Sequence, residues 1–252
     1  MAVNVLAIVQ ARMGSTRLPG KTLIEIEGKP LLEHVINRIR YSKTIDDIII
    51  ATTTGPEDKA IVSMAEKLHV ATYTGSSEDV LDRFYQAASL FSAKKIVRIT
   101  ADDPFKDPKV IDEIVNYFFS HPELDYVSNT IEPSYPVGID VEVFSYEALK
   151  TSWQKAKSFR DREHVTPYIW CNPSLFKVAN YKHTQQLSHL RWTIDTKEDL
   201  QMTREVYKKL YVEDEIFYMD DILQLLSKHN HISDINSGVK QLTIAPQDQI
   251  IE

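Results

Sequence analysis

The sequence has very little cysteine and no long hydrophobic run. Cys171 is the only cysteine among 252 residues, so no intrachain disulfide can form and a reducing compartment is expected. No apolar stretch approaches the length that crosses a bilayer, and the amino terminus lacks the basic segment of a signal peptide. From these absences we predict a cytoplasmic protein that has no membrane partner.

Positive charge is also scarce. The chain carries 29 Lys and Arg against 36 Asp and Glu, a formal net charge of −7, which argues against a nucleic-acid partner. The remaining composition is ordinary for a globular protein, with 43% hydrophobic and 26% charged residues. A chain of this length can enclose a sizeable core, and we interpret residues 1–252 as a single α/β domain.

Two familiar active-site motifs are missing. No Gly-x-Ser-x-Gly elbow is present, so acyl transfer through a serine has no support. The stretch from Gly14 to Gly20 resembles a P-loop, but five residues separate its glycines instead of four, and Pro19 lacks a backbone donor. A P-loop must also open a helix, and the segment that follows is too short for one before Gly28.

The most informative stretch runs from Gln10 to Lys21 and follows an apolar run over residues 3–9 that predicts a buried strand. It gathers Arg12, Arg17 and Lys21 with two hydroxyls, two glycines and a proline. Glycine lets a backbone approach a ligand closely, and cations form charge-assisted bonds with phosphate oxygens. We interpret this stretch as a phosphate-binding loop; the alternative is a solvated basic loop.

Strands and helices alternate in the first half of the chain. Hydrophobic patterns predict strands over 3–9, 47–52, 70–74 and 95–100, and helices over 30–39, 57–68, 76–91 and 108–120. This alternation predicts a Rossmann-like, mostly parallel sheet flanked by helices. Such sheets bind ligands at the carboxyl ends of their strands, where the polar segments 12–21, 52–55, 74–76 and 100–104 are all expected.

The second half of the chain has a different pattern. It predicts strands over 125–129, 137–144, 175–181 and 190–194, and helices over 145–157, 161–170, 197–211 and 218–228. We interpret 130–190 as an inserted acceptor lobe rather than an independently folding domain. The tail after Ser237 is predicted to be weakly ordered.

Asp102 and Asp195 each follow a predicted strand. A carboxylate at that position is well placed to hold Mg²⁺, which prefers oxygen ligands. The residues leave other interpretations open: Asp102 precedes Asp103-Pro104, which is typical of a turn, and Asp195 suits the N-cap of the next helix. Asp199 is expected only to complement the dipole of that helix.

Two later segments offer polar groups for an acceptor. Asp140 and Glu142 share one face of the predicted strand over 137–144 and suit hydroxyl groups of a sugar; an exposed edge-strand face is the alternative. Residues 160–164 place cations, anions and the His164 imidazole at a helix start. Arg83 is predicted on a helix near the ligand edge, and a solvated helix charge is the alternative for it.

The stretch Gln10-Ala-Arg-x-x-Ser-x-Arg-Leu-Pro-x-Lys21 resembles the nucleotide loop of the cytidylyltransferases that make CMP-activated sugar acids. The segments Pro-x-Gly-x-Asp-x-Glu-x-Phe over 136–144 and Asp-Arg-Glu-His over 161–164 resemble the spore-coat polysaccharide biosynthesis protein F group. The resemblance implies a nucleotide-diphospho-sugar transferase type of fold with an acceptor and dimerisation lobe, and a homodimer. It also implies CTP and a sugar or sugar acid as substrates, Mg²⁺ as cofactor, and a role in surface polysaccharide biosynthesis.

The resemblance also implies roles for individual residues. The catalytic set is Arg12, Lys21 and Asp102, and the metal ligands are Asp102 and Asp195. The nucleotide-binding set is Ala11, Arg12, Gly14, Ser15, Arg17, Lys21, Thr53, Arg83 and Thr100. The acceptor-binding set is Asp140, Glu142, Arg162, Glu163 and His164. The chain has Thr193 where sialic-acid relatives have a further Asp, so the number of metal ions stays open, as does the role of Asp103.

The predicted reaction is nucleotidyl transfer, in which an acceptor oxygen attacks the α-phosphorus of CTP and pyrophosphate leaves. Two other classes stay open. A glycosyltransferase that uses a nucleotide-sugar donor would carry Asp-x-Asp after a strand, whereas Asp102 and Asp103 are adjacent. A non-catalytic nucleotide-binding module would show affinity without turnover.

Overall fold

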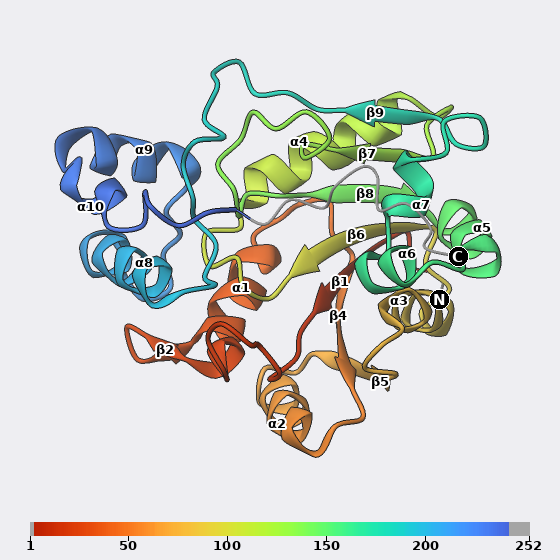
Figure 1. Ribbon diagram of the computed structural model, residues 1–252, viewed down its shortest axis with the longest axis horizontal. Coiled ribbons are helices and arrows are strands. Elements are labelled where there is room, and N and C mark those ends of the chain that lie inside the picture. Colours follow the sequence, from red (N-terminus) through yellow and green to blue (C-terminus); the bar gives the residue numbers. More distant parts are fainter. Residues whose placement is uncertain (1–2, 242–252) are drawn as a thin grey trace.

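The computed structural model describes residues 3–241 and contains a seven-stranded sheet with helices on both of its faces (Figure 1). The strands lie in the spatial order β5-β4-β1-β6-β8-β7-β9. Their bounds are β1 Val5–Gln10, β4 Asp47–Thr53, β5 Ala71–Gly75, β6 Lys95–Thr100, β7 Tyr126–Ser128, β8 Glu142–Ser145 and β9 Val178–Asn180. β8 is antiparallel to its neighbours β6 and β7, and every other pair in this sheet is parallel. The predicted α/β fold is confirmed.

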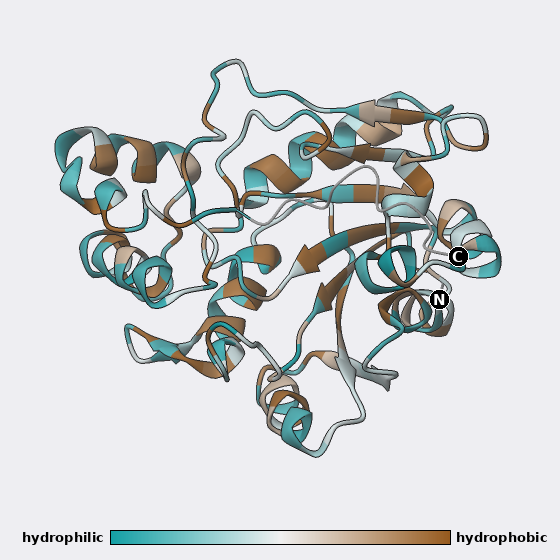
Figure 2. Cartoon of the chain, in the orientation of Figure 1, coloured by the Kyte–Doolittle hydropathy of each residue, from teal (hydrophilic) through white to brown (hydrophobic). Residues whose placement is uncertain are grey.

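The core lies on both faces of the sheet because successive strand residues point to opposite sides. In β1, Val5, Ala7 and Val9 belong to one buried cluster, and Leu6 and Ile8 belong to the other. Figure 2 shows β1 and β6 as largely hydrophobic, with a hydrophilic stretch inside β6. A strand covered on both faces reads as a continuous apolar run in the sequence, which is why the parallel strands were predictable.

Helices cover both faces of the sheet. The helices α1 Leu31–Arg40, α2 Lys59–Lys67, α4 Pro108–Ser120, α8 Lys197–Leu210, α9 Met219–Lys228 and α10 His231–Asp234 contribute to one buried cluster. The helices α3 Val80–Leu90, α5 Tyr146–Lys155 and α7 Pro167–Trp170 contribute to the other, and α6 Phe159–His164 packs against α3. A small hairpin, β2 Glu25–Ile26 with β3 Lys29–Pro30, precedes α1.

Three predictions for the second half of the chain are wrong. The segment predicted as a strand over 190–194 forms a single bridge within residues 3–241, from Arg191 to Val137. The strand predicted over 137–144 is regular only from Glu142, because Gly138 adopts φ 102° in a turn. The helix predicted over 161–170 divides at Val165, where φ is 73°, and Pro167 begins the second piece.

Residues 130–190 extend the main sheet. β8 and β9 take their places in it, and α5 and α6 pack on α3. Most of the tail that was predicted to be weakly ordered, residues 242–252, lies outside the described residues. No helix within 3–241 combines the length and the apolarity that crossing a membrane requires.

Candidate active site

The phosphate loop after β1 is fastened to the neighbouring strand by Asp58. This aspartate lies in a short 3-10 helix, Pro56–Asp58, and is 1% exposed. Its Oδ1 accepts a hydrogen bond from the Met13 amide at 2.7 Å, and its Oδ2 accepts one from the Thr53 amide at 3.2 Å and another from the Thr53 hydroxyl. Thr22 secures the other end of the loop by donating to the Arg12 carbonyl at 2.8 Å. The sequence analysis missed Asp58, because an Asp near a helix start is ordinary capping chemistry.

Lys21 is the centre of the site. Its Nζ donates to Asp102 Oδ2 at 2.7 Å, to Asp195 Oδ1 at 2.8 Å and to the Ile194 carbonyl at 2.8 Å. The Lys21 side chain is 12% exposed. Burial lowers the pKa of Lys21, but the two carboxylates outweigh burial, so the pKa lies above its ordinary value. The structure thus brings together three residues that the sequence analysis singled out separately.

Asp195 is held from several sides. Its Oδ1 also pairs with Arg17 at 2.9 Å, and its Oδ2 accepts from Arg191 at 2.7 Å. Burial raises the pKa of Asp195, but Lys21 and Arg191 overcome burial and bring the pKa below its ordinary value. The N-cap of α8 is Thr196, in a capping box with Asp199, so the interpretation of Asp195 as that cap is wrong.

Asp199 does more than complement a helix dipole. Its side chain is fully buried and accepts two hydrogen bonds from Arg191, at 2.9 and 3.1 Å, and others from the amides of Asp195 and Thr196. Asn236 donates to both Asp199 Oδ1 and the Arg191 carbonyl at 2.9 Å. This network fixes the backbone and the side chain of Asp195 from behind.

The two adjacent aspartates after β6 point in different directions. Asp102 contacts Lys21, whereas Asp103 is 2% exposed and accepts from Lys106 Nζ at 2.9 Å and from the Thr100 hydroxyl at 2.7 Å. Lys106 is fully buried and also donates to the Asp140 carbonyl. Asp103 is therefore a structural anchor that joins the loop after β6 to the segment before β8.

Arg83 is completely buried, which excludes the solvated helix charge that the sequence left open. Its Nη1 donates to the Ser76 carbonyl, and within residues 3–241 its Nε and Nη2 have no partner. Burial lowers the pKa of Arg83, and the nearby Arg12 guanidinium lowers it further. Buried guanidinium nitrogens normally have acceptors, so Arg12 and Arg83 form a place that suits an anion.

The residues predicted for the acceptor divide into two groups. Both oxygens of Glu142 are engaged: Oε1 by Arg98, and Oε2 by the hydroxyls of Tyr126 and Thr166. Arg162 is likewise committed, because its guanidinium pairs with Asp79, the N-cap of α3. These two residues support the wall of the site.

The other residues predicted to bind the acceptor are more accessible to solvent. The side chains of Glu163 and His164 are 32% and 36% exposed and lie 3.9 Å apart, with burial lowering the pKa of His164. Asp140 is half-buried, and burial followed by the charge of Asp103 raises its pKa to about 7. The sequence analysis passed over Arg98. It lies on β6, on the same face of the sheet as Gln10 of the neighbouring β1, and donates to Gln10 Oε1 at 3.3 Å. Its only sequence signal is a cation within an apolar strand.

The oxygens around Lys21 have the chemistry that Mg²⁺ requires. Two carboxylates and one carbonyl already surround a single cation, the Lys21 ammonium. Within residues 3–241 no group of three or more His, Cys, Asp and Glu side chains could enclose a metal. Mg²⁺ usually takes one or two carboxylates and completes its shell with water and substrate phosphates, so Asp102 and Asp195 fit this ion.

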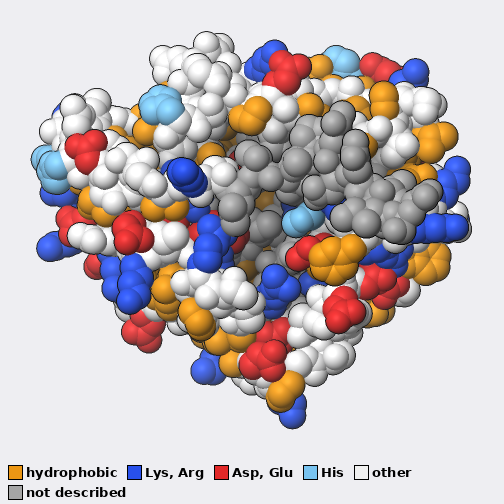
Figure 3. Space-filling view, in the orientation of Figure 1, with side chains coloured by type: hydrophobic (Ala, Val, Ile, Leu, Met, Phe, Trp, Pro, Cys, Tyr) orange, Lys and Arg blue, Asp and Glu red, His pale blue; other side chains and the backbone are white. Residues whose placement is uncertain are grey.

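Charged side chains of both signs gather near the middle of the face shown in Figure 3.

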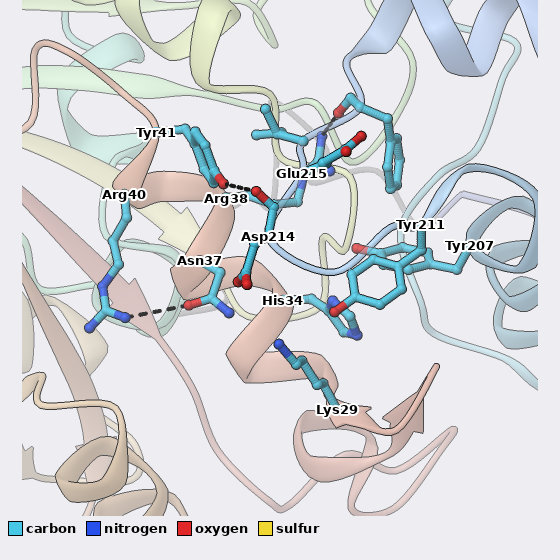
Figure 4. A pocket seen from close by; sticks show the side chains of 12 residues that line it. Lys29, His34, Asn37, Arg38, Arg40, Tyr41, Tyr207, Tyr211, Asp214 and Glu215 are labelled. Carbon is cyan, nitrogen blue, oxygen red and sulfur yellow. Dashed lines mark hydrogen bonds between the residues drawn. The ribbon is translucent and has the colours of Figure 1, made fainter.

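A separate pocket of about 200 Å³ lies between α1 and the segment 207–217 (Figure 4). It shares no residue with the site around Lys21. Its wall contains His34, whose Nε2 lies 2.7 Å from the Ile26 carbonyl and whose pKa burial lowers to about 4.

Residues 6–242 match the model of the cytidylyltransferase family. The chain belongs to this family. One similar protein is the spore coat polysaccharide biosynthesis protein SpsF of Bacillus subtilis, which is 35% identical over 214 residues, covering 82% of this chain and 87% of that protein. An uncharacterized protein of Methanocaldococcus jannaschii, MJ1063, is 40% identical over 243 residues, covering 95% and 97%.

A solved structure supports the same assignment. A cytidylyltransferase from Leptospira borgpetersenii superposes with a TM-score of 0.85 at 28% identity, covering 97% of this chain and 99% of that one. The family and the fold that the loop Gln10–Lys21 indicated are therefore confirmed.

Proposed function

We propose that the protein is a Mg²⁺-dependent cytidylyltransferase that transfers CMP from CTP to a sugar or sugar acid for surface polysaccharide biosynthesis. The observation that carries the proposal is the meeting of Lys21 with Asp102, 81 residues away, and with Asp195, 174 residues away. Charged groups brought together over such distances in the sequence are frequent at ligand-binding sites. Family membership and the resemblance of the loop to CTP-binding sequences support the choice of nucleotide.

In the proposed reaction, the acceptor hydroxyl oxygen bonds to the α-phosphorus of CTP, the bond to pyrophosphate breaks, and the hydroxyl proton passes to solvent or a nearby base. Arg12, Arg17 and Lys21 bind the triphosphate and offset the charge that builds on the leaving pyrophosphate. Arg83 is buried near Arg12 and adds positive charge to the nucleotide side of the site. Catalysis rests on positioning and charge, so no covalent protein nucleophile is required.

Asp102 and Asp195 would hold Mg²⁺, which supplies electrostatic stabilisation of phosphate oxygens when bound. Asp140, Glu163 and His164 face the acceptor, while Glu142 and Arg162 keep that wall in place through their buried partners. Ala11, Gly14, Ser15, Thr53 and Thr100 shape the nucleotide side. We expect the lobe over 130–190 to form a homodimer.

One assay tests the proposal. Pyrophosphate release is measured with each of the four nucleoside triphosphates against a panel of sugar acids and sugar phosphates, with Mg²⁺ and with EDTA. We expect release that requires CTP, an acceptor and the metal. UDP release from UDP-sugars without pyrophosphate would instead identify a glycosyltransferase, and CTP binding without turnover across the panel would indicate a binding module.

A further inference from the structure

The Lys21 ammonium occupies the position between the two proposed metal ligands. It contacts Asp102, Asp195 and the Ile194 carbonyl at 2.7 to 2.8 Å. Three oxygens around one cation form the kind of hard-oxygen environment that a divalent ion also seeks. Because both carboxylates bind the same nitrogen, a metal that used both would compete directly with Lys21.

The charge around these carboxylates is already balanced. Asp195 contacts three cations, Lys21, Arg17 and Arg191, and Lys21 is shared with Asp102. The Arg191 and Lys21 side chains are 7% and 12% exposed, so water screens their charge only in part. A bare divalent ion would add positive charge to a cluster with no surplus negative charge. A triphosphate would supply negative charge to balance the metal ion, and its phosphate oxygens would give the Lys21 ammonium new partners.

The loop backbone allows Lys21 to change partners by its side chain alone. The Lys21 amide donates to the Leu18 carbonyl at 3.2 Å, and the Ile24 amide donates to the Lys21 carbonyl at 3.1 Å. A lysine carries a compact charge on a flexible four-carbon stem. The ammonium can therefore swing while the loop stays fixed.

We propose that Lys21 is the resident counter-ion of the metal site, so that a divalent cation binds only together with a nucleoside triphosphate. On binding, the ammonium leaves the two carboxylates for the phosphates. The inference rests on the proposed function and adds an order of binding to it: the metal arrives as a metal–triphosphate complex and does not bind first.

Mn²⁺ binding tests this order; it is measured from the electron paramagnetic resonance signal of the free ion, after subtraction of the Mn²⁺ that CTP binds in the absence of protein. The probes are Mn²⁺ alone and Mn²⁺ with CTP, applied to the full-length wild type, Lys21→Met, Lys21→Arg and the control Lys29→Met. Lys29 pairs with Glu33 and Glu213, away from the site. Circular dichroism and thermal melts confirm that each variant is folded.

We expect the wild type, Lys21→Arg and Lys29→Met to bind Mn²⁺ weakly without CTP and much more tightly with it. Without CTP, Lys21→Met should bind Mn²⁺ at least about tenfold more tightly than the wild type does, because the positive charge that contacts both carboxylates has been removed. Adding Asp195→Asn to Lys21→Met should remove this gain. If the gain persists in the double variant, the ion sits elsewhere and the proposal is overturned.

Two further results would overturn the inference in distinguishable ways. Tight Mn²⁺ binding to the wild type without CTP would reject Lys21 as a counter-ion while leaving the proposed cytidylyl transfer intact. Equal weak binding in the wild type and Lys21→Met, with and without CTP, would reject the counter-ion and the metal site together. If Lys21→Met does not fold, Lys21→Gln replaces it with the same expectation.

Discussion

Single residues at this site carry more than one interaction, and Asp58 is the simplest example. It satisfies the Met13 amide, the Thr53 amide and the Thr53 hydroxyl while almost entirely buried. A buried donor that loses its acceptor pays the cost of desolvation in full. The rigidity of the phosphate loop therefore depends on an aspartate that contacts no predicted ligand.

Asp58→Ala should lower the free energy of unfolding by about 2 to 4 kcal/mol, since it leaves buried donors unpaired. Urea denaturation measures this loss. In the same variant, KM for CTP should rise more than kcat falls, because the loosened loop adopts its CTP-binding conformation less often. Glu57→Ala, at an exposed neighbouring position, is the control and should change neither quantity.

Lys21→Ala should reduce pyrophosphate release by about a hundredfold or more, as expected for loss of a cation that stabilises charge in the transition state. The melting temperature should change little, because the loss of the ion pairs is offset by the desolvation cost that the partly buried ammonium no longer imposes. A fall in activity explained entirely by a fall in the folded fraction would remove Lys21 from the reaction.

Asp140 should make stability depend on pH. Its pKa of about 7 in the folded protein lies above the ordinary value of an aspartic acid, so the folded state favours the protonated form. This contribution is complete in acid and is lost as pH rises through the folded-state pKa. Asp140→Asn should therefore raise the melting temperature relative to the wild type at about pH 8.5, by roughly half as much at about pH 5.5, and hardly at all near the ordinary aspartate pKa of 3.8. The opposite order would show that Asp140 is ionised in the folded protein.

At the scale of the elements, the site depends on a close approach between two irregular segments. Gly138 has φ 102°, and a Cβ there would lie 2.8 Å from the Thr193 amide nitrogen and from the Trp192 carbonyl carbon. The Trp192 amide donates to the Val137 carbonyl at 2.7 Å. This contact aligns the segment before β8 with the one that carries Asp195.

Gly138→Ala should lower stability by about 2 to 4 kcal/mol, because a side chain adds both backbone strain and a clash with main-chain atoms. Activity per folded molecule should fall as well, since the segment that carries Asp195 must shift. Thermal melts and pyrophosphate release measure the two effects. Gly14→Ala, where an added Cβ meets no atom within 4 Å, should leave the melting temperature unchanged.

Sequence patterns predicted the parallel half of the fold well because β1, β4 and β6 are largely buried on both faces and the helices are amphipathic. They failed where long-range contacts decide the structure. Leu190 to Ile194 is apolar enough for a strand, but among the residues that the structure describes it forms only one bridge. The contact of Asp58 with the Met13 amide was also beyond prediction, because the two residues are 45 positions apart and nothing local to a backbone anchor shows where its partner lies.

At the scale of the whole molecule, the site joins the two ends of the described chain. Arg17 and Lys21 come from the loop after β1, whereas Asp195 precedes α8. A ligand that contacts both sides should stabilise the entire fold, because it binds only when both sides are in place.

CTP with Mg²⁺ should therefore raise the melting temperature by several degrees at saturation, as expected for a ligand near a hundred times its Kd, which is worth about 2.7 kcal/mol. Either component alone should do much less. Differential scanning calorimetry makes this comparison, and Asp195→Asn should abolish the joint effect. Additive shifts from CTP and Mg²⁺ separately would show that they bind independently.

The span of 174 residues between Lys21 and Asp195 also bears on how the protein is made. During synthesis the basic turn is translated well before Asp195, and the strands β1, β4, β5 and β6 all end before residue 101. A nascent chain can thus assemble its nucleotide half while its second carboxylate is still untranslated. Premature termination anywhere in this interval would leave a polypeptide with its cationic turn but without Asp195, so the proposed site can be completed only after Asp195 has been translated.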